Sequence, residues 1–280
     1  MDTHTPLPDA SPKRRTDAAH LIAARERYGS PRARAREKRT LALGWLFLWR
    51  ASTPGLIRRY LGIQADGYCA ALERAGLVTI SRTAAVRGSR VVMLSDLGVT
   101  LIGGDYPEHI GSYDTRFATV DVRRLVHDLA VQSAVLDAME RSEAAGRPVV
   151  GFLPERLCGR ADVSGGKRPD ALLWLDADEL PLAVEVERTP KRPGVELDRA
   201  LTAAARSIER AEVRAYVYIA VNAPLLTLYR DTLARPLPQW RKDPVSGKWV
   251  ATGQAWTVPA EIQARFSWRH LAGLLDPFVP

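Results

Sequence analysis

The spacing of apolar residues in the first third of the chain predicts three short helices in succession. In TLALGWLFLWRAST the large apolar groups, Trp45 and Trp49 among them, recur at helical intervals. TPGLIRRYLGI begins with Thr53 and Pro54, which is typical of a helix start, and the helical pattern of QADGYCAALERAGLV ends at Gly76, which suits a helix C-terminus. We expect both tryptophans to pack in a core.

The pattern then changes to alternation in VTISRTAAVRGSRVVMLSDLGVTLIGG, which predicts a β-hairpin. Gly88 and Ser89 supply its turn, and a short helical turn begins at Ser95. Three helices and a two-stranded wing form the order of a winged helix-turn-helix. LERAGLV and RVVMLSDLGVTLI resemble the end of the third helix, the wing and the following turn in that family.

The second half of the chain predicts a different succession of elements. A long helix in VDVRRLVHDLAVQSAVLDAMERSEAAGRP stops at Gly146 and Pro148. Strands follow in VVGFLPE, DALLWLD and PLAVEVE, then a helix over residues 194–211 and a strand in AYVYIAV, so the order is α-β-β-β-α-β. Beyond these we expect a hairpin around Ser246 and Gly247 and a closing helix in ARFSWRHLAGLL.

The charge of the chain indicates the kind of partner. Its 280 residues carry a formal net charge of +8, with a sequence pI near 9.8. Nucleic acid is the commonest polyanion that such a protein meets, and an anionic membrane surface is the weaker alternative. The longest apolar run, Leu41 to Trp49, is far shorter than the roughly 20 residues that span a membrane. We expect DNA as partner, no membrane, a cytoplasmic location, and buried thiols at Cys69 and Cys158.

The winged-helix resemblance implies which residues contact DNA. The third helix of that fold normally enters the major groove, and it would present Gln64 and Tyr68, which offer little bidentate recognition of bases. Arginines of the second helix and the wing are expected to contact phosphates: Arg58, Arg59, Arg82, Arg87 and Arg90. The alternatives are a merely solvated basic face, or a winged helix that binds another protein.

Carboxylates gather in KRPDALLWLDADELPLAVEVERTPK, although the chain as a whole is basic. Asp170 precedes one strand and Glu185 lies on its hairpin partner, so both can converge on one divalent cation, with the Val186 carbonyl as a further oxygen ligand. Mg²⁺ or Mn²⁺ is the expected metal, which would polarise a phosphodiester and acidify an attacking water. Taken alone, a Pro-Asp pair before a strand is also common turn chemistry.

The element order, with Pro169-Asp170 followed by Glu185-Val186-Glu187, resembles the PD-(D/E)xK nuclease core. Glu187 occupies the position at which that family has a lysine. Alternation along the strand puts Glu185 and Glu187 on one face, roughly 6 to 7 Å apart, so that Glu187 points at the same site.

A cation near this strand is expected from Lys191, with Arg188 and Lys167 as alternatives. Together with the winged helix, and with His127 on the first helix of the core, the arrangement resembles the replication-relaxation family. That family includes the MobC-type mobilisation relaxases, which cut one strand at a plasmid transfer origin. The resemblance places five residues at or facing the catalytic site: Asp170, Glu185, Glu187, Lys191 and His127. Asp128, next to His127, is expected to face solvent.

The expected fold is therefore of the α/β (α+β) class, a winged helix-turn-helix followed by a restriction-endonuclease-like core with a mixed sheet. The expected segments are a mobile basic arm at 1–39, the winged helix at 40–104, a linker at 105–119, the nuclease-like domain at 120–235 and a hairpin-and-helix extension at 236–280.

The expected function is metal-dependent DNA nicking in plasmid or mobile-element mobilisation or replication, together with other proteins of those processes. The alternative, which Glu187 in place of lysine supports, is an inactive DNA-binding accessory or regulatory factor on a degenerate nuclease fold. A third hypothesis is a protein-interaction scaffold.

Tryptophans alternate with basic residues in the C-terminal third of the chain. The set consists of Trp240, Arg241, Lys242, Lys248, Trp249, Trp256, Trp268 and Arg269. Such interleaving suits stacking on single-stranded nucleic acid, but tryptophans also cover the edge of a core, which is the interpretation we favour from sequence.

Overall fold

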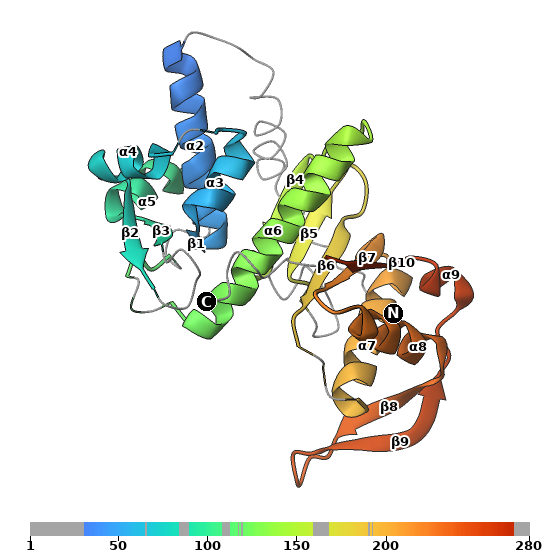
Figure 1. Ribbon diagram of the computed structural model, residues 1–280. Helices are drawn as coiled ribbons and strands as arrows, with labels where there is room; N and C mark the ends of the chain where they lie inside the picture. The colour runs from blue at the N-terminus through green and yellow to red at the C-terminus, as the bar shows by residue number, and fades with distance from the viewer. Residues whose placement is uncertain are drawn as a thin grey trace.

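The computed structural model describes residues 31–64, 66–83, 90–107, 113–116, 118, 120–158, 168–189, 191 and 193–271. It is a mixed α/β structure whose N-terminal elements form one group (Figure 1). These elements are α2 (Pro31–Trp49), β1 (Ala51–Ser52), α3 (Pro54–Leu61), α4 (Tyr68–Arg74), β2 (Val78–Arg82), β3 (Arg90–Leu94) and α5 (Asp96–Gly103).

Local signals in the sequence explain the bounds of the short helices. The hydroxyl of Thr53 accepts a hydrogen bond from the Leu56 amide at 3.2 Å, and Pro54 occupies the first turn of α3. Gly62 ends this helix with a φ of 60°, in the left-handed region that glycine adopts without strain. Ser95 caps α5 in the same manner as Thr53, through the Gly98 amide. The predicted helix starts at Thr53 and Ser95 are confirmed.

The predicted hairpin is present as β2 and β3, which pair in antiparallel fashion. Its predicted turn, including Gly88 and Ser89, lies outside the described residues, as does Arg87. We did not predict β1, which pairs with β3 and completes a three-stranded sheet of order β1-β3-β2. The two residues of β1 are too few to produce a recognisable alternation in sequence.

The second group of elements contains a five-stranded mixed sheet. It comprises α6 (Val122–Ala144), β4 (Gly151–Pro154), a 3₁₀ turn η3 (Glu155–Leu157), β5 (Ala171–Trp174), β6 (Leu182–Glu187), α7 (Val195–Glu209), β7 (Ala215–Ala220), α8 (Ala223–Ala234), β8 (Leu237–Lys242), β9 (Trp249–Trp256), α9 (Ala260–Gln263) and β10 (Phe266–His270). The sheet has the order β10-β7-β6-β5-β4, while β8 and β9 form a separate hairpin.

The direction of the strands follows from their connections. A connection that contains η3 joins β4 to β5, a short turn joins β5 to β6, and both pairs are antiparallel. The helix α7 lies between β6 and β7, so these strands are parallel, as are β7 and β10. The predicted α-β-β-β-α-β order from α6 to β7 is therefore confirmed.

Two boundaries differ from our predictions. Residues 31–39, assigned to a mobile arm, belong to α2, which begins at Pro31 rather than near Thr40. The closing helix expected in ARFSWRHLAGLL is wrong, because Phe266 to His270 form β10 beside β7. Phe266 and Trp268 alternate along this strand, and both rings stack on Tyr218 with centroids 6.1 and 5.2 Å away. Pairing with β7 thus makes residues Phe266 to His270 a strand rather than a helix.

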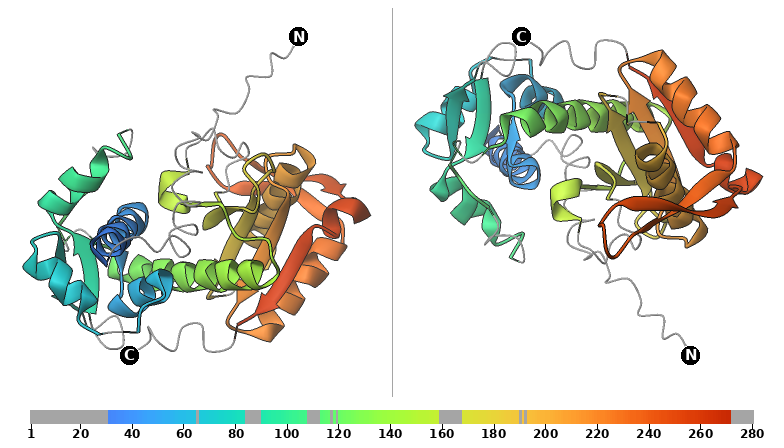
Figure 2. Two further views of the ribbon diagram at one scale, coloured as in Figure 1. Left: turned by 90° about the horizontal axis from the view of Figure 1, so that it is seen from above. Right: turned by 90° about the horizontal axis from the view of Figure 1, so that it is seen from below.

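The N-terminal elements and the sheet domain share one continuous core. In both views of Figure 2, α6 runs from the N-terminal elements to the five-stranded sheet. The indole of Trp45 on α2 donates to Ser52 and to Gln132 of α6, at 3.1 and 3.2 Å, and its ring contacts Phe152 of β4. Trp45 and Trp49 are 0% and 5% exposed, which confirms their predicted place in the core.

Polar contacts also cross this junction. The Arg156 guanidinium donates to the Phe47 and Leu48 carbonyls near the end of α2, at 2.7 and 2.8 Å. The predicted linker takes part as well, since the hydroxyl of Tyr113 donates to the Arg50 carbonyl and accepts from the Leu94 amide.

Both cysteines are buried, as we predicted. Within the described ranges, no helix combines the length and apolar character needed to cross a membrane.

Candidate functional site

The carboxylate of Asp170 lies between α6 and β6, where both of its oxygens are engaged. Its Oδ2 accepts a hydrogen bond from the backbone amide of Val186 at 2.7 Å, and its Oδ1 lies 3.1 Å from Nε2 of His127. Its own carbonyl accepts from the Glu155 amide at 2.9 Å. Asp170 immediately precedes β5. Its backbone is bound to Glu155 of η3, and its carboxylate is bound to β6 and α6, so the side chain has one defined direction.

The contact with Asp170 changes the protonation of His127. Burial lowers the pKa of this imidazole, but the hydrogen bond to Asp170 and the negative charge of Asp170 outweigh burial and raise it above its ordinary value. The imidazolium form is therefore favoured near neutral pH more than in an isolated histidine. A protonated His127 can donate to the Asp170 carboxylate, or to an anion that approaches it.

The two glutamates of β6 lie on the same face of the strand, as alternation predicted. Glu185 and Glu187 are only 4% and 7% exposed. The residue opposite Ala171 is Val184, so continuing the register by one residue places Asp170 opposite Glu185. Buried carboxylates are costly unless they are paired or hydrogen-bonded, which makes a strand carrying two of them unusual for a purely structural role.

Lys191, expected to supply a cation near this strand, lies beside Glu187. The ammonium of Lys191 forms an ion pair with the Oε1 of Glu187, and it also lies 5.8 Å from the centre of the Tyr229 ring. The sequence spacing of four residues past the strand was enough to find this lysine. Arg188, one of the alternatives, has its pKa lowered by burial, whereas Lys167 lies outside the described residues.

Sequence reasoning missed Asp128, which we expected to face solvent. It lines a pocket of about 20 Å³ together with Arg124, His127, Glu155 and Asp170. Burial raises the pKa of Asp128 to about 6, more than the nearby Arg124 and His127 lower it. The spacing of Arg124 and Asp128, one helical turn apart, was the available signal, but it is equally typical of a solvated helix face.

The donors suit a hard divalent cation in chemical type but are not gathered around one point. Among the described residues, no three His, Cys, Asp or Glu side chains are placed to hold a metal ion together. Asp170 is turned towards His127 and the Val186 amide, and Glu187 towards Lys191. Binding of Mg²⁺ by Asp170, Glu185 and the Val186 carbonyl would therefore require the Asp170 carboxylate to leave His127 and the Val186 amide.

The residues predicted to contact DNA fall into different environments. Arg59 donates to Glu140 and forms ion pairs with Asp137 and Glu140, so it ties α3 to α6. Its pKa is raised, chiefly by the hydrogen bond to Glu140, which outweighs burial. Arg58 forms an ion pair with the exposed Asp66.

The predicted recognition helix is shorter than expected. Because Gly67 precedes it with a φ of 90°, α4 begins at Tyr68, and Gln64 lies exposed before the helix. The hydroxyl of Tyr68 is buried, and burial raises its pKa to about 12, so this group is not presented to a base. Where β2 ends and β3 begins, Arg82 and Arg90 are both exposed, so their guanidinium groups are open to a phosphate.

Arg82 and Arg90 are direct cross-strand partners in the β2–β3 pair. Two like charges placed opposite one another destabilise a hairpin, and an anion bound between them removes that penalty.

Comparison of the chain with known protein families, with curated proteins and with solved structures gives no significant match.

Proposed function

We propose that this chain is a DNA-binding protein that joins a winged helix to a PD-(D/E)xK-like nuclease domain and nicks one DNA strand in a metal-dependent reaction. Mobilisation or replication of a plasmid or other mobile element, together with other proteins of those processes, is the proposed setting. The observation that carries the proposal is the position of Asp170, hydrogen-bonded to the backbone between Glu185 and Glu187.

The proposal is supported by the agreement of topology and side chains. The α-β-β-β-α-β order places Asp170 at the head of the second strand and the glutamate pair on the third. A metal ion, Mg²⁺ or Mn²⁺, would supply Lewis acidity towards a phosphodiester. The residues of this chain would orient the scissile phosphate: Lys191 by its positive charge, and His127 by donating from the imidazolium form.

A plasmid-nicking assay tests the nuclease function. We expect supercoiled plasmid carrying DNA from the protein's own genetic neighbourhood to be converted to open circles with Mg²⁺ or Mn²⁺, and to stay supercoiled with a chelator. The chelator control separates metal-dependent cleavage from contamination by metal-independent nicking activity. Intact plasmid in every condition, with duplex binding demonstrated in parallel, would exclude the nuclease.

The DNA-binding part of the proposal predicts the effect of changing the wing. Arg82→Ala combined with Arg90→Ala should weaken duplex affinity about equally for all sequences and lower the slope of log affinity against log salt by about 2, or about 1 for each lost phosphate contact. Titration of labelled duplex at several salt concentrations measures both quantities. We omit Arg59 from this test because it is bound to Asp137 and Glu140.

The matched control for the wing removes the same charge elsewhere. Arg141→Ala combined with Arg230→Ala changes two exposed arginines on α6 and α8. We expect the salt slope of this variant to equal that of the wild type. An equal loss of slope in both double variants would show that net charge alone drives binding, and would contradict a specific contact by the wing.

A second candidate function is an inactive DNA-binding accessory or regulatory factor. It is favoured by the ion pair of Glu187 with Lys191 and by the separate engagement of Asp170, which together leave the described carboxylates without a common metal position. This function predicts the same response to the wing variant and no nicking with any metal.

A further inference from the structure

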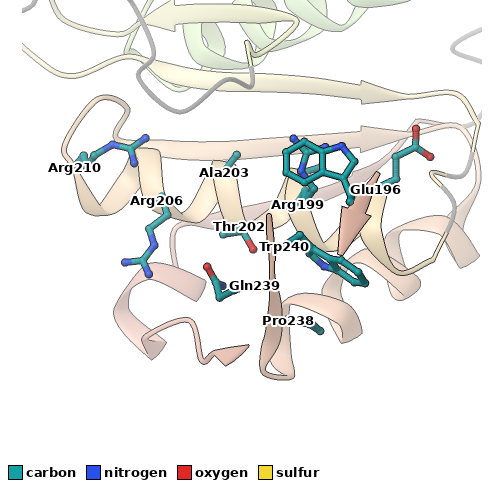
Figure 3. A pocket seen from close by; sticks show the side chains of 11 residues that line it. Glu196, Arg199, Thr202, Ala203, Arg206, Arg210, Pro238, Gln239 and Trp240 are labelled. Carbon is teal, nitrogen blue, oxygen red and sulfur yellow. The ribbon is translucent and has the colours of Figure 1, made fainter. Parts of the chain in front are cut away.

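A groove of about 420 Å³ lies between α7 and the β8–β9 hairpin, on elements other than those that hold Asp170 and His127. Figure 3 shows Arg199, Thr202 and Arg206 of α7 facing Gln239 and Trp240 of β8. The α7 residues recur at intervals of three and four and therefore share one face of the helix. The groove volume is within the range of roughly 300–1,000 Å³ that is typical of ligand sites.

Two arginines of the groove wall each stack on a tryptophan of β9. The guanidinium carbon of Arg199 lies 3.3 Å from the centre of the Trp249 ring, and that of Arg206 lies 3.7 Å from the centre of the Trp256 ring. A guanidinium stacked on an indole keeps its N–H groups available in its own plane, where they can bind phosphate oxygens.

The positive charge of Arg199 is not balanced by a carboxylate. Arg206 forms an ion pair with Glu209, and Arg210, at one end of the groove, forms one with Glu212. Within the described part of the chain, Arg199 forms no ion pair, and its guanidinium lies against the Trp249 ring. The hairpin adds the exposed cations Arg241, Lys242 and Lys248. The acids of this region are Glu196, which lines the groove, and Asp243 in the hairpin turn.

Two polar groups in the groove wall lack a hydrogen-bond partner in the ranges that the structure describes. The indole nitrogen of Trp240 and the hydroxyl of Thr202 are buried, and neither has a hydrogen-bond partner among the described residues. Both residues line the groove. Buried polar groups in folded proteins are nearly always satisfied, and a ligand in the groove would satisfy these two after a small shift of the groove wall that exposes them.

We propose that the groove between α7 and the β8–β9 hairpin binds single-stranded nucleic acid. Phosphates contact Arg199 and the hairpin cations, and a base stacks on the exposed side of Trp249, which is 37% exposed. Basic residues interleaved with aromatic rings are the common features of such sites, because every base offers a face for stacking. This site is additional to the proposed nuclease and does not depend on it.

The charge and the rings together favour a strand over the other ligands of similar chemistry. A duplex hides its base faces, so it would use the cations but not Trp249. A free nucleotide would use one ring and one cation, whereas the row formed by Arg199 with Trp249 and Arg206 with Trp256 follows α7 and repeats the same pair. The repetition suits a ligand in which phosphate and base also repeat.

Fluorescence anisotropy with a labelled oligothymidylate of about 15 nucleotides tests the proposal, because single-strand sites span about 4 to 16 nucleotides. We expect Trp249→Ala to weaken binding about fivefold or more through loss of stacking. Arg199→Ala should weaken it and lower the salt slope by about 0.7, the value for one phosphate contact on a single strand. Competition with unlabelled thymidine monophosphate and with a duplex compares the three ligands.

The controls keep the outcome specific to the groove. Trp249→Phe retains a stacking face, so its affinity for the strand should stay within about threefold of the wild type. Arg230→Ala removes an exposed cation from α8, and its affinity should stay within about twofold. Circular dichroism checks that each variant is folded. Unchanged strand affinity in Trp249→Ala and Arg199→Ala, or competition by the nucleotide as strong as by the strand, would overturn the proposal.

The experiment also separates this site from the winged helix. The Arg82→Ala and Arg90→Ala variant should lose duplex affinity but keep strand affinity, whereas the groove variants should do the opposite. Failure of plasmid nicking leaves the strand-binding result unaffected, because the assay needs neither metal nor cleavage.

Discussion

Asp170→Asn is expected to reduce metal-dependent nicking by about 100-fold or more while duplex affinity stays within about twofold of the wild type. Asparagine has nearly the same shape, so its carbonyl oxygen can still accept the Val186 amide, which now donates to Oδ2 of Asp170 at 2.7 Å. What it removes is the negative charge that would serve as a hard ligand in the proposed site and that raises the pKa of His127. Initial rates of open-circle formation, beside duplex titrations, measure the two effects.

The control for this variant is Asp178→Asn. It makes the same chemical change in the exposed turn between β5 and β6, where the Asp178 amide donates to Asp176. We expect its nicking rate to remain within about twofold of the wild type. Equal loss in both variants, or full activity of Asp170→Asn, would show that the Asp170 carboxylate does not belong to the cleaving site.

Trp45→Ala is expected to lower the free energy of unfolding by about 3–5 kcal/mol, the usual cost of removing a large buried aromatic side chain. Trp45 is 0% exposed, and its ring lies 4.3 Å from that of Tyr60 and 5.5 Å from that of Phe152, centre to centre. The substitution also removes the indole donor to Ser52 and Gln132. Urea denaturation followed by circular dichroism measures the loss.

This variant also tests whether the two groups of elements unfold together. Since Trp45 contacts α6 and β4 as well as α3, we expect one cooperative transition that shifts as a whole. Trp249→Ala makes the same substitution at a 37% exposed site and should cost much less. Trp45→Phe retains an aromatic ring and serves if the alanine variant does not fold. A separate early transition of the N-terminal elements alone would contradict a shared core.

Much of the secondary structure could be predicted because its signals are local. Thr53 with Pro54, and Ser95, start helices through hydrogen bonds to amides only three residues away. The α-β-β-β-α-β order followed from periodicity, and the acids of the candidate site were found because strand alternation places Glu185 and Glu187 on one face. Lys191 could be predicted because it follows β6 closely enough for its long side chain to reach back to the strand.

The errors occur where distant segments compete with local preference. Phe266 to His270 have spacing compatible with a helix, but backbone pairing with β7 and stacking on Tyr218 make them a strand. Arg59 has the sequence context of a phosphate contact, yet packing of α3 on α6 brings Glu140 and Asp137 to it. Asp128 was assigned to solvent because a helical pattern does not reveal which neighbouring loops cover it.

By itself, therefore, the sequence determined the elements, their order and the acidic motifs, because caps, periodicity and charge act within a few residues of the chain. Tertiary structure alone decided which groups meet: Asp170 with His127, Trp45 with Gln132, and Arg199 with Trp249. Each of these contacts joins residues that are far apart along the chain, or on separate elements, and forms only when the burial of apolar surface brings those elements together.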